Sequence, residues 1–229
     1  MVFRNLVRDF AGLFYPHICA SCAEALVRNE HLLCTTCRYE LPRTNFHTDP
    51  ENEVAKIFWG RVKIEYASAY FYFQKGGRVQ ELLHKLKYKG QQEIGVEIGK
   101  MIGHDLTSSV FNQVDTIIPV PLHKSKKRKR GYNQSECIAT GIAEAMGKPL
   151  DTRTLHRTIA NATQTKKHRY ERWNNVENIF SLINPENISN KHILLVDDVV
   201  TTGATFEASA SALLHAENVK VSIIAVATA

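Results

Sequence analysis

Two adjacent acids follow an apolar run near the C-terminal end of the chain. Residues Ile193 to Val196 are all apolar and of strand length, and Asp197 and Asp198 come directly after them. In open α/β sheets, ligands bind just beyond the carboxyl ends of the strands. Carboxylates at such a place accept hydrogen bonds from vicinal hydroxyl groups, such as those of a ribose. The acid pair therefore predicts a site for a sugar.

The residues after the acid pair are small or carry a hydroxyl group. Their backbone N–H groups can close on an anion, and the start of the helix predicted to follow adds donors at the same place. A sugar phosphate satisfies both halves of the site, with its hydroxyl groups on the acids and its phosphate in the loop. An acid that only favours a helix N-terminus explains one carboxylate beside the helix, not two set well before it. The loop residues are Thr201, Thr202, Gly203, Ala204 and Thr205.

The segment Ile193 to Thr205 resembles the motif of type I phosphoribosyltransferases that binds phosphoribosyl pyrophosphate (PRPP), at every position of the motif. In that family the two acids hold the ribose 2′- and 3′-hydroxyl groups and the loop holds the 5′-phosphate. The resemblance gives Asp197 and Asp198 the catalytic and ribose-binding roles, and gives Thr201 through Thr205 the phosphate. It also implies that Mg²⁺ binds together with PRPP.

A strongly basic segment follows a short predicted strand at 116–120. Six of the eight residues from His123 to Arg130 are Lys or Arg. In a parallel sheet this segment, predicted to be a loop, lies at the same edge as the acid pair, where cations stabilise the departing pyrophosphate of PRPP. Nucleic-acid contact is a second interpretation, compatible with the first, and a plain surface loop is a third. The pyrophosphate candidates are Pro121, Lys126, Arg128, Arg130 and Gly131.

A second basic cluster has aromatic residues between its charges. Tyr170 and Trp173 lie among the Lys and Arg residues of 166–173. This mixture suits single-stranded nucleic acid, because phosphates bind the charges and bases stack on the rings. A solvated face with two partly buried aromatic residues is an equal alternative. The nucleic-acid candidates of both basic segments are Lys124, Lys127, Lys129, Lys166, Lys167, Arg169 and Arg172.

Four cysteines near the N-terminus have the spacing of a metal site. Cys19 and Cys22 form one C-x2-C pair, and Cys34 and Cys37 form a second, eleven residues later. Four thiolates complete a tetrahedral Zn²⁺ and leave no open position, so the predicted ion is structural. It would hold together a segment too small to fold on its own core. Two disulfides are the alternative, which a cytoplasmic setting disfavours. Cys137 is expected to be a small core residue.

Strands alternate with helices along most of the chain, which predicts an α/β fold with a parallel sheet flanked by helices. Apolar residues at helical spacing indicate helices at 79–86, 94–106 and 205–217, and a capping-box-like start at Asn133 indicates a helix to Met146. Alternating apolar residues at 62–73 indicate a hairpin or one bent strand. Further strands are predicted at 193–196 and 219–227, a linker at 46–58, and short strands within 150–190.

The composition is that of an ordinary globular chain. Of 229 residues, 44% are apolar and 23% are charged, and the net charge of +6 favours anionic partners. The stretch from Leu6 to Tyr15 is short and interrupted by charges, so it reads as an amphipathic helix rather than a membrane span or a signal peptide. We therefore expect a cytoplasmic protein without a membrane span.

Further residues resemble the ComF family of competence-associated proteins, over about residues 10–229. The resemblance implies a helix and Zn(Cys)4 ribbon at 1–50 and a phosphoribosyltransferase-like domain at 51–229. It also implies a cytoplasmic protein that handles single-stranded DNA, with partners in the DNA-uptake machinery, during natural transformation. The resemblance is found in the four cysteines, in the runs 119–122 and 130–134, and in Leu155, Arg157, Thr163, Gln164, Arg169, Arg172, Asn175 and Phe180.

Three functions are compatible with these patterns. The first is a phosphoribosyltransferase of the ComF type, which transfers ribosyl 5-phosphate from PRPP to an unidentified acceptor. The second is a non-catalytic protein that binds single-stranded DNA and keeps the PRPP site as a ligand sensor. The third is a phosphoribosyltransferase of nucleotide metabolism or salvage. The intact acid pair favours the first, whereas the lack of an identifiable base-reading segment favours the second. Enzymatic activity is left open.

Overall fold

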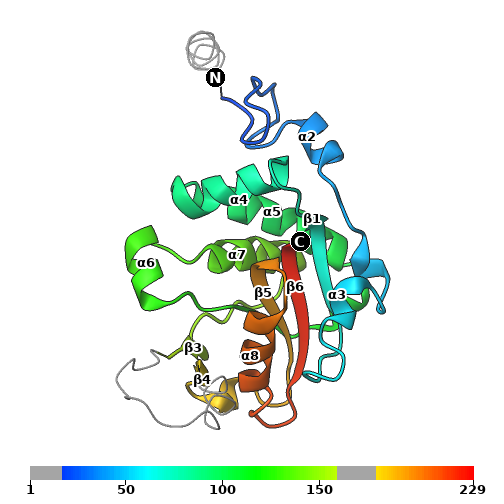
Figure 1. Ribbon diagram of the computed structural model, residues 1–229, viewed down its shortest axis with the longest axis vertical. Helices are drawn as coiled ribbons and strands as arrows, with labels where there is room; N and C mark the ends of the chain where they lie inside the picture. The colour runs from blue at the N-terminus through cyan, green and yellow to red at the C-terminus, as the bar shows by residue number, and fades with distance from the viewer. Residues whose placement is uncertain (1–16, 159–178) are drawn as a thin grey trace.

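Four parallel strands form the central sheet, in the order β1-β6-β5-β2 (Figure 1). The computed structural model describes residues 17–158 and 179–229. Because all neighbouring strands of this sheet run parallel, their carboxyl ends lie at one edge. The predicted parallel α/β fold is confirmed. The strands are β1 (Ala67–Tyr72), β2 (Thr116–Pro119), β5 (His192–Val200) and β6 (Lys220–Thr228).

Helices α4, α5 and α7 cover one face of the sheet (Figure 1). Their buried side chains share a core with Leu194 and Val196 of β5 and with Ile224 of β6. Alternate residues of a strand point to opposite faces, so the residues between these belong to the other layer. The three helices confirm the predicted ones: α4 (Arg78–Tyr88), α5 (Gln92–Leu106) and α7 (Gln134–Met146).

The opposite face is covered by α3, α8 and a small antiparallel pair, β3-β4. Phe206 of α8 and Phe58, just after α3, pack with Leu195 of β5 in this second core. Burial on both faces explains why Ile193 to Val196 form an unbroken apolar run. The elements of this layer are α3 (Glu53–Lys56), α8 (Ala204–Leu213), β3 (Leu155–Arg157) and β4 (Phe180–Leu182). Single 3-10 turns lie at η1 (Phe46–Thr48), η2 (Val110–Gln113) and η3 (Pro185–Asn187).

Helices α5 and α7 pack backbone against backbone. A Cβ atom on Gly99 of α5 would lie 2.1 Å from the carbonyl oxygen of Ile138, and one on Gly141 of α7 would lie 2.0 Å from that of Val96. Only glycine permits this approach. The tight crossing fixes α7, whose first turn carries Ser135 to the carboxyl end of β5.

The segment with the four cysteines packs on α4 and includes a short helix, α2 (Thr35–Glu40). Leu33 and Leu41 are buried in the same core as Leu82 and Leu86 of α4. The segment is therefore part of the same hydrophobic layer as the helices below it. Three ion pairs also join it to α4 and α5, namely Arg38–Glu97, Arg43–Asp105 and Arg78–Glu40.

The linker predicted at 46–58 is wrong, because this stretch forms η1 and α3 and packs on the sheet. The side chain of Asn52 caps α3 by accepting hydrogen bonds from the backbone of Val54 and Ala55. Its amide donates to the carbonyl of Ala67 at the start of β1, at 2.8 Å. One buried asparagine and the buried ring of Phe58 fix a segment whose overall composition is polar.

Residues 62–73 form neither a hairpin nor a long strand. Only β1 is a strand here, and it pairs in parallel with β6. The preceding residues make isolated backbone hydrogen bonds, such as the one from the Glu65 N–H to the Val221 carbonyl at 2.8 Å. Val62 and Ile64 are partly buried against the core of α3 and α8. Their alternation therefore reflects burial, not a second strand.

The basic segment is a helix, α6 (Lys124–Arg130), and not the predicted loop (Figure 1). The ring of His123 accepts the backbone N–H of Ser125 at its start, and Gly131, with φ +88°, ends it. Lysine and arginine are good helix formers, which offsets the repulsion between their solvated charges.

Two predicted features lie outside the described residues. They are the helix at 6–15 and the second basic cluster with Lys166, Lys167, Arg169 and Arg172. Within 17–158 and 179–229, none of the helices has both the length and the apolar character that crossing a bilayer requires.

Candidate functional site

The acid pair lies inside β5, not just after it. The strand was predicted to end at Val196 but continues to Val200, so hydrogen bonds to β6 hold Asp197 and its neighbours in place. Asp197 accepts hydrogen bonds from the hydroxyl group of Ser135 at 2.6 Å and from the backbone N–H of Asp198 at 2.8 Å. The carboxylate of Asp198 is 2.9 Å from the Nζ atom of Lys87, at the end of α4.

The electrostatic environment of Asp197 is unusual. Burial and the neighbouring charge of Asp198 raise the pKa of Asp197 to about 7, against the opposing effects of Ser135, the Asp198 backbone and Lys87. Two carboxylates this close resist ionising together. A ligand that supplies hydroxyl donors or a cation to the pair relieves this cost, so the site favours such a ligand.

The raised pKa has a consequence for stability. Because the folded pKa of Asp197 lies above its ordinary value of 3.8, the stability it contributes is lost as the pH rises through the folded pKa. Asparagine has no proton to lose. We expect Asp197→Asn to raise the Tm of the ligand-free protein at pH 8 by several degrees more than at pH 5, measured by thermal unfolding. A pH-independent difference would contradict the raised pKa.

The predicted phosphate loop joins β5 to α8. Thr201, Thr202, Ala204 and Thr205 are exposed, whereas Gly203 is buried. A hydrogen bond holds the loop in place: the guanidinium group of Arg61 donates to the Thr202 carbonyl at 2.7 Å. The same side chain forms an ion pair with Glu207 in the first turn of α8. Exposed hydroxyl groups and a helix start on a fixed base suit an anion.

Gly203 is the position where the loop tolerates least change. Its φ is +76°, and a Cβ atom there would lie 2.7 Å from Cγ2 of Ile57 and 2.9 Å from Cε1 of Phe58. We expect Gly203→Ala to cost roughly 1–3 kcal/mol of unfolding free energy, measured by urea denaturation. Gly147→Ala is the matched control, because Gly147 also has a positive φ but open space around it. Equal losses in the two variants would contradict the steric argument.

A cavity of about 220 Å³ lies over the acid pair. It brings together residues that the sequence placed in separate segments. Of the predicted site residues, the acids and Thr205 line it together with Pro121, Lys126 and Arg130, whereas Arg128 and Gly131 of the pyrophosphate set do not. Lys124 and Lys127 also lie outside it, and Lys127 is 3.8 Å from Glu136. The cavity thus combines acids, hydroxyl groups and cations in its lining.

Several lining residues were not predicted as site residues: Lys87, Tyr88, Gln134, Ser135 and Arg157. Gln134 and Ser135 directly follow the predicted helix start at Asn133, and Gln134 also belongs to the run 130–134 that resembles the ComF family. Lys87 and Tyr88 end a helix that sequence places far from the acids. Only the packing of α4 on α5, and of α5 on α7, brings them there.

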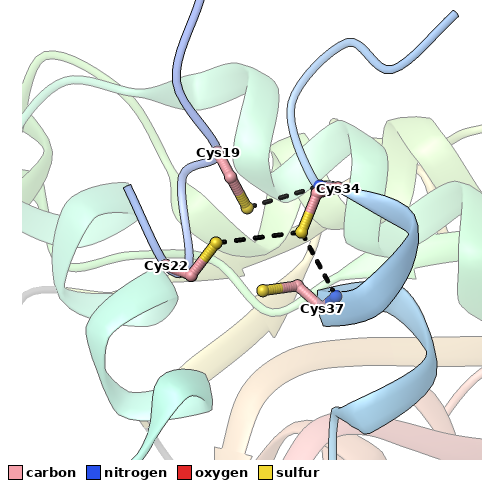
Figure 2. A group of neighbouring side chains, drawn as sticks. All are labelled: Cys19, Cys22, Cys34 and Cys37. Atoms are coloured by element: carbon pink, nitrogen blue, oxygen red, sulfur yellow. Dashed lines mark hydrogen bonds between the residues drawn. The ribbon is translucent and has the colours of Figure 1, made fainter. Parts of the chain in front are cut away.

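The four predicted metal ligands converge. The sulfur atoms of Cys19, Cys22, Cys34 and Cys37 all lie within 4.8 Å of one another (Figure 2). Those of Cys22 and Cys34 are 3.8 Å apart, close to the ~3.8 Å that a tetrahedral ion with Zn–S bonds of about 2.3 Å requires. All four are free thiols, so the disulfide alternative is not what the structure contains. The cluster is compatible with zinc.

Backbone donors favour a thiolate at Cys19, whereas burial and the neighbouring cysteines raise the pKa values of Cys34 and Cys37. The N–H groups of Ser21 and Cys34 point at the Cys19 sulfur, at 3.4 and 3.3 Å. Burial alone would raise the pKa of Cys19, but these donors and that of Cys22 lower it to about 6. A preformed thiolate binds a metal ion without first losing a proton. This donor set therefore fits Zn²⁺. Cys137 is buried in α7, outside the cluster.

Helix α4 touches both sites. The ammonium group of Lys85 donates to the carbonyl of Ala20, between the first two cysteines, at 2.7 Å. Two residues on, Lys87 contacts Asp198. Between them, the Leu86 carbonyl accepts the hydroxyl hydrogen of Tyr132. One helical turn thus links the cysteine cluster to the acid pair.

Comparison with known proteins agrees with this geometry. Residues 108–229 match the phosphoribosyl transferase domain, and the chain belongs to that family. It is 30% identical to the DNA utilization protein YhgH of Shigella flexneri over 86% of this chain and 84% of that one. It is 28% identical to the competence protein ComFC of Bacillus subtilis over 87% of this chain and 72% of that one. The predicted membership of the ComF group is confirmed.

Among solved structures, the allosteric regulatory enzyme of purine biosynthesis is similar to this chain. The TM-score is 0.44 and the sequence identity 20%, over 62% of this chain and 30% of that one.

Proposed function

We propose that this protein binds PRPP together with Mg²⁺ in the cavity over Asp197 and Asp198, and transfers the ribosyl 5-phosphate to an acceptor. One observation carries the proposal. The two acids, Thr205 of the predicted phosphate loop and the cations of α4 and α6 line a single cavity at the carboxyl edge of the sheet. These groups match the vicinal hydroxyl groups, the 5′-phosphate and the pyrophosphate of PRPP.

Each part of the cavity has a role in this proposal. The carboxylates of Asp197 and Asp198 accept the ribose hydroxyl hydrogens, and the loop from Thr201 to Thr205 holds the 5′-phosphate. Lys126 and Arg130 face the pyrophosphate, which leaves with the electron pair of the C1–O bond. The acceptor then forms the new bond at C1. Mg²⁺, which prefers oxygen ligands, would neutralise charge on the pyrophosphate between these cations and the acids.

In this proposal, the side chain of Lys87 must change its contact when PRPP binds. In the described structure its ammonium group neutralises Asp198. A ribose hydroxyl group that reaches Asp198 replaces this contact and frees Lys87 to bind the pyrophosphate. Lys87→Met is therefore expected to weaken PRPP binding by roughly tenfold, the loss of one charge-assisted hydrogen bond. Calorimetric titration checks this, with Lys89→Met as the control because Lys89 does not line the cavity over the acids.

The test of the function itself has two stages. Calorimetric titration of PRPP with Mg²⁺ into the wild type is expected to show binding. Pyrophosphate release is then measured with nucleobases, nucleosides and single-stranded DNA as acceptors. Release with any of them establishes transfer. Binding without release would reduce the protein to a PRPP sensor, and no binding would refute the proposal.

The relatives' names direct the choice of acceptors toward DNA. They are called DNA utilization and competence proteins, and we propose that this chain acts in the cytoplasm on incoming single-stranded DNA, with proteins of the uptake machinery. The observation that favours DNA as a ligand is α6, whose Lys and Arg side chains are mostly exposed beside the cavity. Binding of an oligonucleotide that weakens steeply with salt is expected. A flat salt dependence would refute contact through α6.

A further inference from the structure

A second cavity, of about 330 Å³, adjoins the first between the end of α4 and α6. We call it the Tyr88 cavity. It shares Lys87, Tyr88, Lys126 and Arg130 with the cavity over the acids. It adds Gly90, Lys129 and Tyr132. A molecule that fills it therefore lies directly beside the proposed PRPP site.

The chemistry of the Tyr88 cavity differs from that of its neighbour. Its lining contains no acid and no small hydroxyl residue; it consists of two tyrosines, four cationic side chains and a glycine. A sugar would find no carboxylate to hold its hydroxyl groups here. Aromatic rings next to positive charges fit a planar ring that is flanked by phosphates.

Tyr88 is displayed, not buried. The residue is 68% exposed, although a ring of this size normally hides most of its apolar surface. Its position is nonetheless fixed, because it ends α4 and the guanidinium group of Arg130 lies 5.6 Å from its ring centre. Tyr132 is held as well, by its hydrogen bond to Leu86. A fixed and exposed ring is a surface on which a base can stack.

The cations beside the Tyr88 ring are spaced to bind successive phosphates of a nucleic-acid strand. Lys126 and Lys129 are both exposed on α6, one helical turn apart, and neither forms an ion pair among the described residues. The charges are therefore available to successive phosphates of a chain that passes the ring. A single free nucleotide would use only part of this row.

We propose that the Tyr88 cavity binds single-stranded DNA, with one base stacked on Tyr88 and the flanking phosphates on Lys126 and Lys129. This inference rests on the proposed function in one respect: it places a DNA base beside the proposed PRPP site. The ligand that approaches the ribose of PRPP is then one nucleotide of a DNA strand. The stacking contact itself requires neither PRPP nor transfer.

The experiment separates stacking from charge. A fluorescently labelled oligothymidylate and a strand of the same length with abasic positions are titrated with protein, and anisotropy gives both affinities. The wild type is expected to prefer the strand with bases by roughly tenfold, the contribution of one stacked base. Tyr88→Ala removes this preference, and Tyr88→Phe keeps it. Lys129→Gln weakens both strands alike and lowers the salt dependence.

Tyr39→Ala is the matched control. Tyr39 is 89% exposed on α2, in the cysteine segment, and lines neither cavity. This variant is expected to keep the wild-type preference. Thermal unfolding confirms that Tyr88→Ala is folded, as the exposure of the ring leads us to expect.

The outcomes distinguish the two proposals. A wild type that binds both strands equally, that binds neither, or a Tyr88→Ala variant that keeps the preference would each overturn the stacking site. A PRPP titration is run on the same wild-type sample. No PRPP binding with an intact base preference would refute the proposed function and leave the stacking site in place.

Discussion

The variant Asp197→Asn/Asp198→Asn is expected to lose PRPP binding altogether in a calorimetric titration with Mg²⁺. Both carboxylates then become amides, which accept hydrogen bonds weakly and carry no charge for a cation. Hydrogen bonds to charged groups contribute about 1.5–3 kcal/mol each, so removing both charges lowers affinity by at least two orders of magnitude.

The fold of this variant is expected to survive. Asparagine has the shape of aspartate, and its oxygen atom at position 197 can still accept the hydroxyl hydrogen of Ser135. The control is Glu144→Gln, since Glu144 lies on the exposed side of α7 in an ion pair with Lys100. Unchanged PRPP affinity in the double variant would mean that the ligand binds elsewhere. A loss in Glu144→Gln as well would point to a general effect of charge.

Sequence alone could identify the acid pair and the cysteines because their chemistry is encoded locally. Asp197 and Asp198 are neighbours, and the cysteines form two C-x2-C pairs. The parallel topology then placed α6 beside the acids, because successive parallel strands deliver their carboxyl ends to one edge. The cavity that contains Lys126 and Arg130 with the acids agrees with that step.

The rest of the site depends on packing that no local pattern shows. Lys87 reaches Asp198 because α4 packs on α5, and α5 lies close to α7 because Gly99 and Gly141 let the two helix backbones touch. A glycine in a helix pattern is indistinguishable from a weak helix former until its neighbour is known. The packing of residues 46–58 was likewise not visible in the sequence, because it depends on the hydrogen bonds that Asn52 makes to α3 and to β1.

Zinc removal has the second large expected effect. Cys34→Ser is expected to abolish stoichiometric zinc, measured by metal analysis of the purified protein, and to loosen the segment from residue 17 to 45. The segment has few buried apolar side chains of its own and one six-residue helix. Zinc binding by small cysteine-rich segments contributes about 10–16 kcal/mol of apparent free energy, more than such a core supplies. Faster hydrogen exchange in this segment is the structural readout.

Cys137→Ser is the control, because Cys137 is buried in α7 and takes no part in the cluster. It is expected to keep its zinc.

The contacts of α4 extend the prediction to the second site. Without the metal, the carbonyl of Ala20 no longer holds Lys85, and the end of α4 that carries Lys87 and Tyr88 loses one of its anchors. PRPP affinity should therefore fall in Cys34→Ser as well. Retained zinc would refute the cluster as a metal site, whereas lost zinc with unchanged PRPP affinity would show that the cysteine segment and the acid pair act independently.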